Sequence, residues 1–151
     1  AGPFMSVKDY QEHIKPWHKK YIASTKRRFP KAKIMAHCCG SIFQLIPELI
    51  DIGIEVLNPI QPQAANMDPH NLEKNFGERL CFHGGIDVQR ILPFGTENDV
   101  ERHVENVITE LGPGGGYVLA PSHQLHTDIP PQNIHAMFRK ALSFGKYPIA
   151  V

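Results

Sequence analysis

The chain has 151 residues, of which 42% are hydrophobic and 21% are charged, so its composition suits one globular domain and excludes a disordered or fibrous segment. The net charge of +1 excludes a strong basic field, and we expect neither nucleic acid nor a membrane surface as a partner. The three cysteines include an adjacent pair, and neither a secretory leader nor an apolar run of about 20 residues is present. We therefore expect a cytoplasmic protein that acts on a small molecule.

The amino-terminal part of the chain has the pattern of a long helix. Ser6 followed by Asp9 resembles a capping box. Large apolar and aromatic residues then recur at helical spacing, at Tyr10, Ile14, Trp17 and Tyr21. This pattern predicts a helix over about 7–28. Pro16 is expected to kink or split it, because proline removes a backbone donor and crowds the preceding turn.

The rest of the chain alternates short apolar runs with helical patterns. The runs predict strands at about 33–37, 54–60, 80–84 and 117–120. Helices are predicted at about 42–52, 69–76, 97–111 and 131–144, with Gly53, Gly77 and Gly112 as stop signals. The GPGGG run at 112–116 precedes a strand and not a helix, so we interpret it as a connection rather than a phosphate-binding loop. The alternation predicts an α/β fold of parallel βαβ units.

Polar residues follow each predicted strand at its carboxyl end. They are His37, Cys38 and Cys39, then Asn58, Gln61 and Gln63, then His83 and Asp87, and finally Ser122, His123 and His126. Ligands bind at this edge both in open parallel sheets and in (βα)8 barrels, so the pattern predicts a functional face. Four parallel strands are too few to close a barrel, and we expect a partner or a longer barrel to supply the missing strands.

One pair of residues on this face has the chemistry of a metal site. On an extended strand, His37 and Cys39 point the same way and Cys38 points the other way. Imidazole and thiolate suit zinc, which in catalytic sites takes three protein ligands. His123 is the first candidate for the third ligand, ahead of His83 and His126. The alternative is that His37 is a general acid or base and Cys39 a nucleophile that it activates.

Three segments of the chain resemble one known superfamily. AHCCGSIFQLIPELIDIGIEVLNPIQP, FHGGIDVQRILPFGT and GGGYVLAPSHQLHTDIPPQNIHAMF are similar to the carboxyl-terminal half of uroporphyrinogen decarboxylase superfamily members. Those proteins are single (βα)8 (TIM) barrels of roughly twice this length, so the resemblance implies a barrel rather than an open sheet. It also implies that residues 1–151 are one partial domain, the carboxyl-terminal βα units without the amino-terminal half, and it suggests a homodimer.

Within this superfamily, HCCG resembles the His-x-Cys-Gly segment of the cobalamin-dependent methyltransferase branch. The resemblance implies that His37, Cys39 and a later residue bind Zn²⁺, and that a zinc-bound thiol attacks the methyl group of a methylcobamide carried by a corrinoid protein. His123 stands about where that branch has a later cysteine, which predicts ligation by two histidines and one cysteine. Decarboxylases carry a histidine there, so contact of His123 with a substrate carboxylate is the alternative.

Four further residues are candidates for substrate binding, namely Asn58, Gln61, His83 and Asp87. Asn58 and Gln61 are equally well interpreted as support for the metal ligands or as residues of a surface loop. Asp87, in the GGID segment, matches a family block near the pocket, but it is also suited to cap a following turn.

The function predicted from these features is zinc-dependent methyl transfer from a methylcorrinoid protein to a thiol or folate acceptor, in a demethylation pathway. The first alternative is uroporphyrinogen decarboxylation in porphyrin biosynthesis, for which the resemblance implies arginines and an aspartate in the amino-terminal half of the barrel. The second alternative is a noncatalytic half-barrel that binds a corrinoid or a protein partner.

Overall fold

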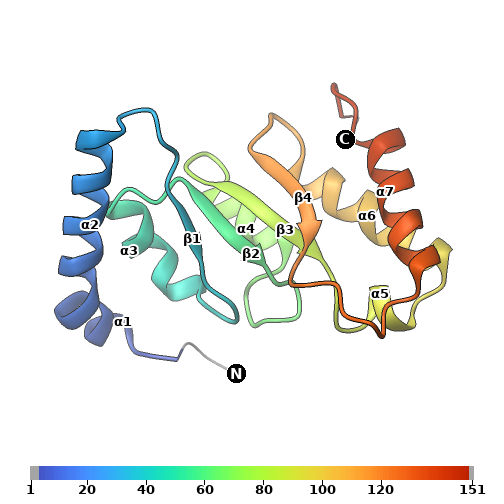
Figure 1. Ribbon diagram of the computed structural model, residues 1–151, viewed down its shortest axis with the longest axis horizontal. Helices are drawn as coiled ribbons and strands as arrows, with labels where there is room; N and C mark the ends of the chain where they lie inside the picture. The colour runs from blue at the N-terminus through green and yellow to red at the C-terminus, as the bar shows by residue number, and fades with distance from the viewer. Residues whose placement is uncertain (1–3, 150–151) are drawn as a thin grey trace.

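The computed structural model describes residues 4–149 and is built on a parallel sheet with the strand order β1-β2-β3-β4 (Figure 1). The strands are β1 (Met35–His37), β2 (Val56–Ile60), β3 (Cys81–Ile86) and β4 (Tyr117–Pro121). All three neighbouring pairs are parallel, as predicted. Because the spatial order follows the chain order without reversal, the sheet has the arrangement of successive units of a barrel.

The helices connect and cover these strands. They are α1 (Val7–Asp9), the π-helical turn η1 (Tyr10–Ile14), α2 (Lys15–Arg28), the 3₁₀ turn η2 (Phe43–Leu45), α3 (Ile46–Asp51), α4 (Pro69–Phe76), α5 (Ile91–Phe94), α6 (Glu97–Leu111) and α7 (Pro131–Phe144). The helices predicted at 69–76, 97–111 and 131–144 have the predicted bounds. The segment predicted as one helix at 42–52 is instead a 3₁₀ turn followed by α3. Helix α5 was not predicted from the sequence, because four residues are too few to show a period.

The long amino-terminal helix is interrupted where Pro16 predicts a break. The backbone N–H of Lys15 donates to the carbonyl of Tyr10, five residues earlier, and this wider turn directly precedes Pro16. The wider turn makes room for the proline ring, which would crowd the preceding turn of a regular α-helix. Ser6 caps the start of the helix, because its hydroxyl accepts a hydrogen bond from the backbone N–H of Asp9 at 3.0 Å.

Helices cover one face of the sheet. Figure 1 shows α4 and α6 behind the strands, and α6 contacts both β3 and α7. Leu57 of β2 and Phe82 of β3 are 0% and 1% exposed and belong to the core on this side. Side chains alternate along a strand, so Asn58 and His83 lie on the opposite face. That second face is the one a complete barrel turns inward.

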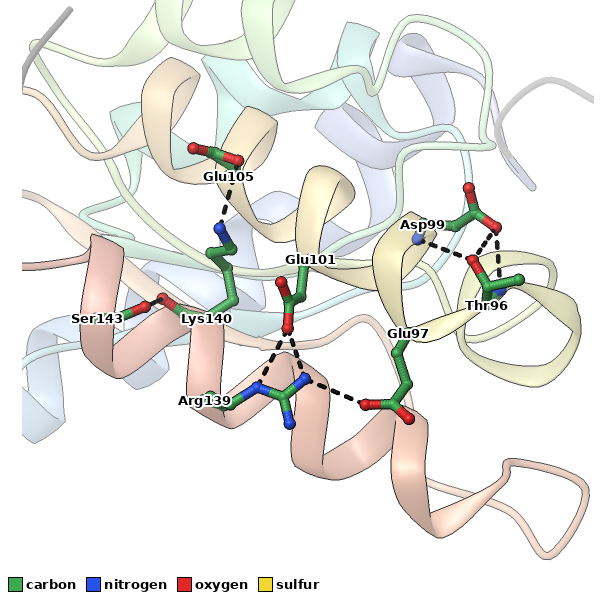
Figure 2. Close-up of polar contacts among 8 residues, drawn as sticks. All are labelled: Thr96, Glu97, Asp99, Glu101, Glu105, Arg139, Lys140 and Ser143. Carbon is green, nitrogen blue, oxygen red and sulfur yellow. Dashed lines mark hydrogen bonds and ion pairs between the residues drawn. The ribbon is translucent and has the colours of Figure 1, made fainter.

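Ion pairs join α6 to α7 at the surface (Figure 2). Carboxylates of α6 face cations of α7 in three pairs, Glu97–Arg139 at 3.1 Å, Glu101–Arg139 at 2.6 Å and Glu105–Lys140 at 3.5 Å. The start of α6 has a capping box between Thr96 and Asp99. The hydroxyl of Thr96 donates to the carboxylate of Asp99 and, with the other donors, holds the pKa of Asp99 at about 2. These contacts join α7 to α6 in the helical layer.

A second polar cluster connects α2 to the first strand. The carboxylate of Glu55 accepts hydrogen bonds from Lys26 at 2.5 Å and Lys33 at 2.8 Å, and from the backbone N–H of Ile34 at 3.2 Å. The hydrogen bond from Lys26, followed by that from Lys33, lowers the pKa of Glu55 from 4.5 to about 2. Glu55 therefore connects α2 to the residues that directly precede β1.

This cluster predicts a pH dependence of stability. The pKa of Glu55 is lower in the folded protein, so its contribution is complete above the ordinary value of 4.5 and is lost as the pH falls toward about 2. We expect the stability advantage of the wild type over Glu55→Gln, measured by urea unfolding, to shrink across this window. An advantage that stays constant down to the lowest pH at which both proteins fold would contradict the prediction.

Candidate active site

The His-x-Cys pair lies at the carboxyl end of β1. His37 is the last residue of this strand, and the distance between its Nε2 atom and Sγ of Cys39 is 3.6 Å. Both side chains are exposed. Cys38 packs instead against the core, and its burial raises the pKa of its thiol. The pair therefore shares one face, as strand periodicity predicts, and the two neighbouring thiols have different environments.

The side chain of Asn58 connects this pair to the third strand. Asn58 is the register partner of His37 across β1 and β2. Its Oδ1 atom lies 2.6 Å from Nδ1 of His37, and its Nδ2 atom lies 2.6 Å from Nδ1 of His83. Three neighbouring strands thus each contribute one residue to a continuous row, which we call the His37–Asn58–His83 chain. It brings together three of the predicted site residues.

Gln61 supports the loop that follows Cys39. Its Oε1 atom accepts a hydrogen bond at 2.9 Å from the backbone N–H of Gly40. Gly40 has a φ of +86°, in the left-handed region that favours glycine, which explains the glycine after the second cysteine. Of the two interpretations of Gln61, the geometry favours support for the loop that carries Cys39.

Asp87 turns inward rather than toward the open face of the sheet. It is 2% exposed, and its Oδ1 atom accepts hydrogen bonds from the backbone N–H groups of Gln89 at 2.7 Å and Arg90 at 3.0 Å. This is the geometry of the capping interpretation. A role of Asp87 in substrate binding stays a prediction.

His123 lies apart from the His-x-Cys pair. It follows β4 and is exposed, and its ring stacks on that of His126 with centroids 6.3 Å apart. β4 and β1 are the two edges of the sheet, with β2 and β3 between them. Within residues 4–149, no three His, Cys, Asp or Glu residues form a group that could hold a metal ion. The predicted ligand set of His37, Cys39 and His123 is therefore not assembled here, because the two edges of a sheet approach across a barrel mouth only when the sheet curves around.

A cavity extends from this site, and the sequence pattern did not predict it. It has a volume of about 630 Å³ and lies between the amino-terminal helix and β1. Its lining is mostly apolar and includes Tyr10, Ile14 and Ile22 as well as His37 and Cys39. The helical spacing of Tyr10 and Ile14 was the available signal, but it does not tell a core-facing stripe from a cavity wall.

The comparisons with known proteins identify the family. The model of the uroporphyrinogen decarboxylase (URO-D) family matches residues 1–143. The chain belongs to the uroporphyrinogen decarboxylase family. It is 22% identical over 137 residues to a uroporphyrinogen decarboxylase from Psychromonas ingrahamii and 21% identical over 136 residues to one from Chlorobaculum tepidum. These matches cover 87% and 88% of this chain, but only 36% and 37% of the two relatives.

A solved structure has the same fold as this family member. A methyltransferase from Methanosarcina mazei matches with a TM-score of 0.71 and 19% sequence identity, over 94% of this chain and 39% of that one. The prediction of a partial (βα)8 barrel is confirmed. The chain spans less than two fifths of the length of the relatives it matches. In residues 4–149, no helix has both the length and the apolar character needed to cross a membrane.

A zinc ion, which the resemblance to the methyltransferase branch implies, fits the donors of the His-x-Cys pair. Imidazole and thiolate are donors that zinc prefers, and 3.6 Å between Nε2 of His37 and Sγ of Cys39 is compatible with two ligands of one tetrahedral ion. Metal-bound histidines also hydrogen-bond through their other ring nitrogen, as Nδ1 of His37 does with Asn58. The described part of this family member thus places two donors that suit zinc side by side, and Asn58 supports one of them.

Proposed function

We propose that the protein containing this chain is a methyltransferase of the uroporphyrinogen decarboxylase family, which transfers a methyl group from a methylcorrinoid protein to a thiol or folate acceptor. The observation that carries the proposal is the His37–Cys39 pair, with Nε2 and Sγ 3.6 Å apart and Nδ1 of His37 held by Asn58. A thiolate beside an imidazole selects a soft metal such as zinc. Proton-coupled loss of carbon dioxide from a porphyrinogen does not call for such a pair.

Each residue of the site would have a separate role in this reaction. His37 and Cys39 would hold Zn²⁺, with His123 as the proposed third ligand in a closed barrel. When bound, the ion lowers the pKa of a thiol acceptor, so that the acceptor is a thiolate near neutral pH. Asn58 orients the imidazole of His37, and Gln61 fixes the loop of Cys39 through Gly40. The exposed rim would receive the corrinoid protein, and the remaining strands of the barrel, or a second copy of the chain, would complete the walls.

A methylcobamide carried by the partner protein would supply the methyl group, with cobalt as the leaving group that keeps the electron pair of the broken bond. The thiol acceptor would first lose its proton to solvent, and its sulfur would then take the methyl group. The chain would orient the sulfur at His37 and Cys39 and would provide an apolar wall, since the adjoining cavity of about 630 Å³ is mostly apolar.

Uroporphyrinogen decarboxylation is the second candidate. It is favoured by the names of the relatives at 22% and 21% identity, and by the position of His123 at the rim. A histidine at that place is suited to contact a substrate carboxylate.

One anaerobic assay compares the two candidates. The complete native protein is incubated with methylcobalamin and either 2-mercaptoethanol or tetrahydrofolate, and the conversion of methylcobalamin to cob(I)alamin is followed by absorbance. A parallel sample receives uroporphyrinogen. We expect cob(I)alamin, a methylated acceptor and one zinc per chain by elemental analysis. Coproporphyrinogen without methyl transfer would establish the decarboxylase instead, and the lack of both products would favour the noncatalytic half-barrel.

A further inference from the structure

The basic residues of the chain are concentrated in its amino-terminal part. Residues 8–33 contain nine of the sixteen lysines and arginines but only two of the fifteen acidic residues, which gives this segment a net charge of +7. The remaining residues have a net charge of −6, so the two parts nearly cancel in the total of +1. The total therefore hides a local basic field, of the kind that attracts an oppositely charged partner.

Part of this positive charge is neutralised inside the molecule. Lys15, Lys26 and Lys33 pair with carboxylates of α3 and of the segment before β2. Within residues 4–149, five further cations on α2 and directly after it are exposed and form no ion pair, namely Lys19, Lys20, Arg27, Arg28 and Lys31. Their charge is available to a partner.

Three exposed aromatic rings lie among these cations. Trp17, Tyr21 and Phe29 are 69%, 73% and 56% exposed. Nζ of Lys20 lies 5.9 Å from the centre of the Trp17 ring, and the guanidinium carbon of Arg28 lies 5.6 Å from the centre of the Phe29 ring. Tryptophan, tyrosine and arginine are the residues that contribute most to binding in protein–protein interfaces.

The helical period places these residues on the side of α2 that is turned away from the core. Ile22 is 7% exposed and marks the buried side of the helix. Figure 1 shows α2 at the end of the molecule opposite α7. Residues three, four and seven positions apart share one side of a helix. By this spacing, one outward side carries five residues that we call the basic aromatic face, namely Trp17, Lys20, Tyr21, Arg27 and Arg28.

We infer that the basic aromatic face binds an acidic segment of another protein, whose carboxylates pair with the cations of the face and whose apolar side chains cover its two rings. A helix that binds a membrane surface turns an apolar face outward, whereas the apolar side of α2 is buried and its exposed rings lie between cations. Double-stranded nucleic acid is an extended polyanion, which the net charge of −6 on the rest of the chain repels. A short acidic segment contacts the face without approaching that charge. The binding is independent of the proposed methyl transfer.

The test uses the complete protein and a fluorescein-labelled peptide in which Glu-Glu-Leu is repeated four times. A Gln-Gln-Leu peptide of the same length is the neutral control. By fluorescence anisotropy at low salt, we expect the acidic peptide to bind about tenfold more tightly or better than the neutral peptide. This preference should shrink at about 0.5 M NaCl, because salt screens exposed charges. Equal affinity for the two peptides at low salt would overturn the inference.

Charge reversal locates the binding on the molecule. The triple variant Lys20→Glu, Arg27→Glu and Arg28→Glu should bind the acidic peptide about tenfold more weakly or worse than the wild type. The matched control reverses three exposed cations on other elements, and so changes the net charge by the same amount, with Lys74→Glu, Arg79→Glu and Lys146→Glu. This control should keep its affinity within about twofold. Equal losses in the two triple variants would show that only the total charge matters and would overturn the assignment to α2.

Trp17→Ala tests the aromatic part of the face without changing the charge. We expect it to weaken binding of the acidic peptide by about fivefold or more. Thermal unfolding followed by circular dichroism shows whether each variant folds, and Trp17→Ala keeps the test valid if the triple variant does not fold. An unchanged affinity in Trp17→Ala would overturn the contact with the rings. Tighter binding of a short DNA duplex or of phosphatidylserine vesicles than of the acidic peptide, lost in the α2 variants, would assign the face to a different class of partner and overturn the inference.

Discussion

Replacing Cys39 by alanine is expected to lower the rate of methyl transfer by about a hundredfold or more, since even residues that only support a metal ligand are worth about 10- to 100-fold. Cys39 is exposed and lies 3.6 Å from Nε2 of His37, so its loss leaves one of the two paired donors. We also expect the zinc content of the purified protein to fall. Elemental analysis and the cob(I)alamin assay measure the two effects on the same preparation.

The neighbouring thiol provides a matched control for this experiment. Cys38 differs from Cys39 by one position but packs against the core, where burial raises the pKa of its thiol. Cys38→Ala should keep its zinc and a rate within a few-fold of the wild type, and should lose about 1 kcal/mol of stability from lost packing. If Cys38→Ala loses zinc and activity while Cys39→Ala keeps them, the assignment of the site is wrong.

Replacing Gly84 by alanine is expected to destabilise the protein by about 3 kcal/mol or more, from backbone strain and a steric clash. Gly84 has a φ of +119°, which side-chain-bearing residues rarely adopt. A Cβ atom there would lie 2.8 Å from the backbone nitrogen of Ile60 on the neighbouring strand. A backbone atom cannot avoid the clash by changing rotamer, as a side chain could. Urea unfolding of the complete protein measures the loss. To relieve the clash, β2 would have to move away from β3, and this movement would disturb the contact between Asn58 and His83.

Gly114 separates the two causes. It also has a positive φ, +80°, but a Cβ atom there meets nothing within 4 Å. Gly114→Ala should therefore cost only the backbone strain, about 1–2 kcal/mol. Equal losses at the two positions would show that the contact with Ile60 contributes nothing, and would contradict the close approach of the two strands.

The helices at 69–76, 97–111 and 131–144 were predictable because their signals are local. α6 combines a cap at Thr96 with apolar residues at helical spacing and a glycine at its end. The strands were predictable for the same reason, although their first residues were placed one or two positions too early in three cases. The segment before α3 differs from the single helix predicted at 42–52. Pro47 favours the first turn of a helix, so the regular helix starts at Ile46 after a separate 3₁₀ turn.

The candidate site also has a part that local signals predict and a part that depends on the tertiary structure. The sequence by itself determined that His37 and Cys39 share a face, because alternation along a strand needs only the strand. Only the tertiary structure decided that Asn58 stands between His37 and His83, because the register of β1, β2 and β3 depends on how the strands pack against the helices. It also decided that His123 lies away from the pair: residues at opposite edges of a sheet meet only when the strands between them curve into a closed barrel.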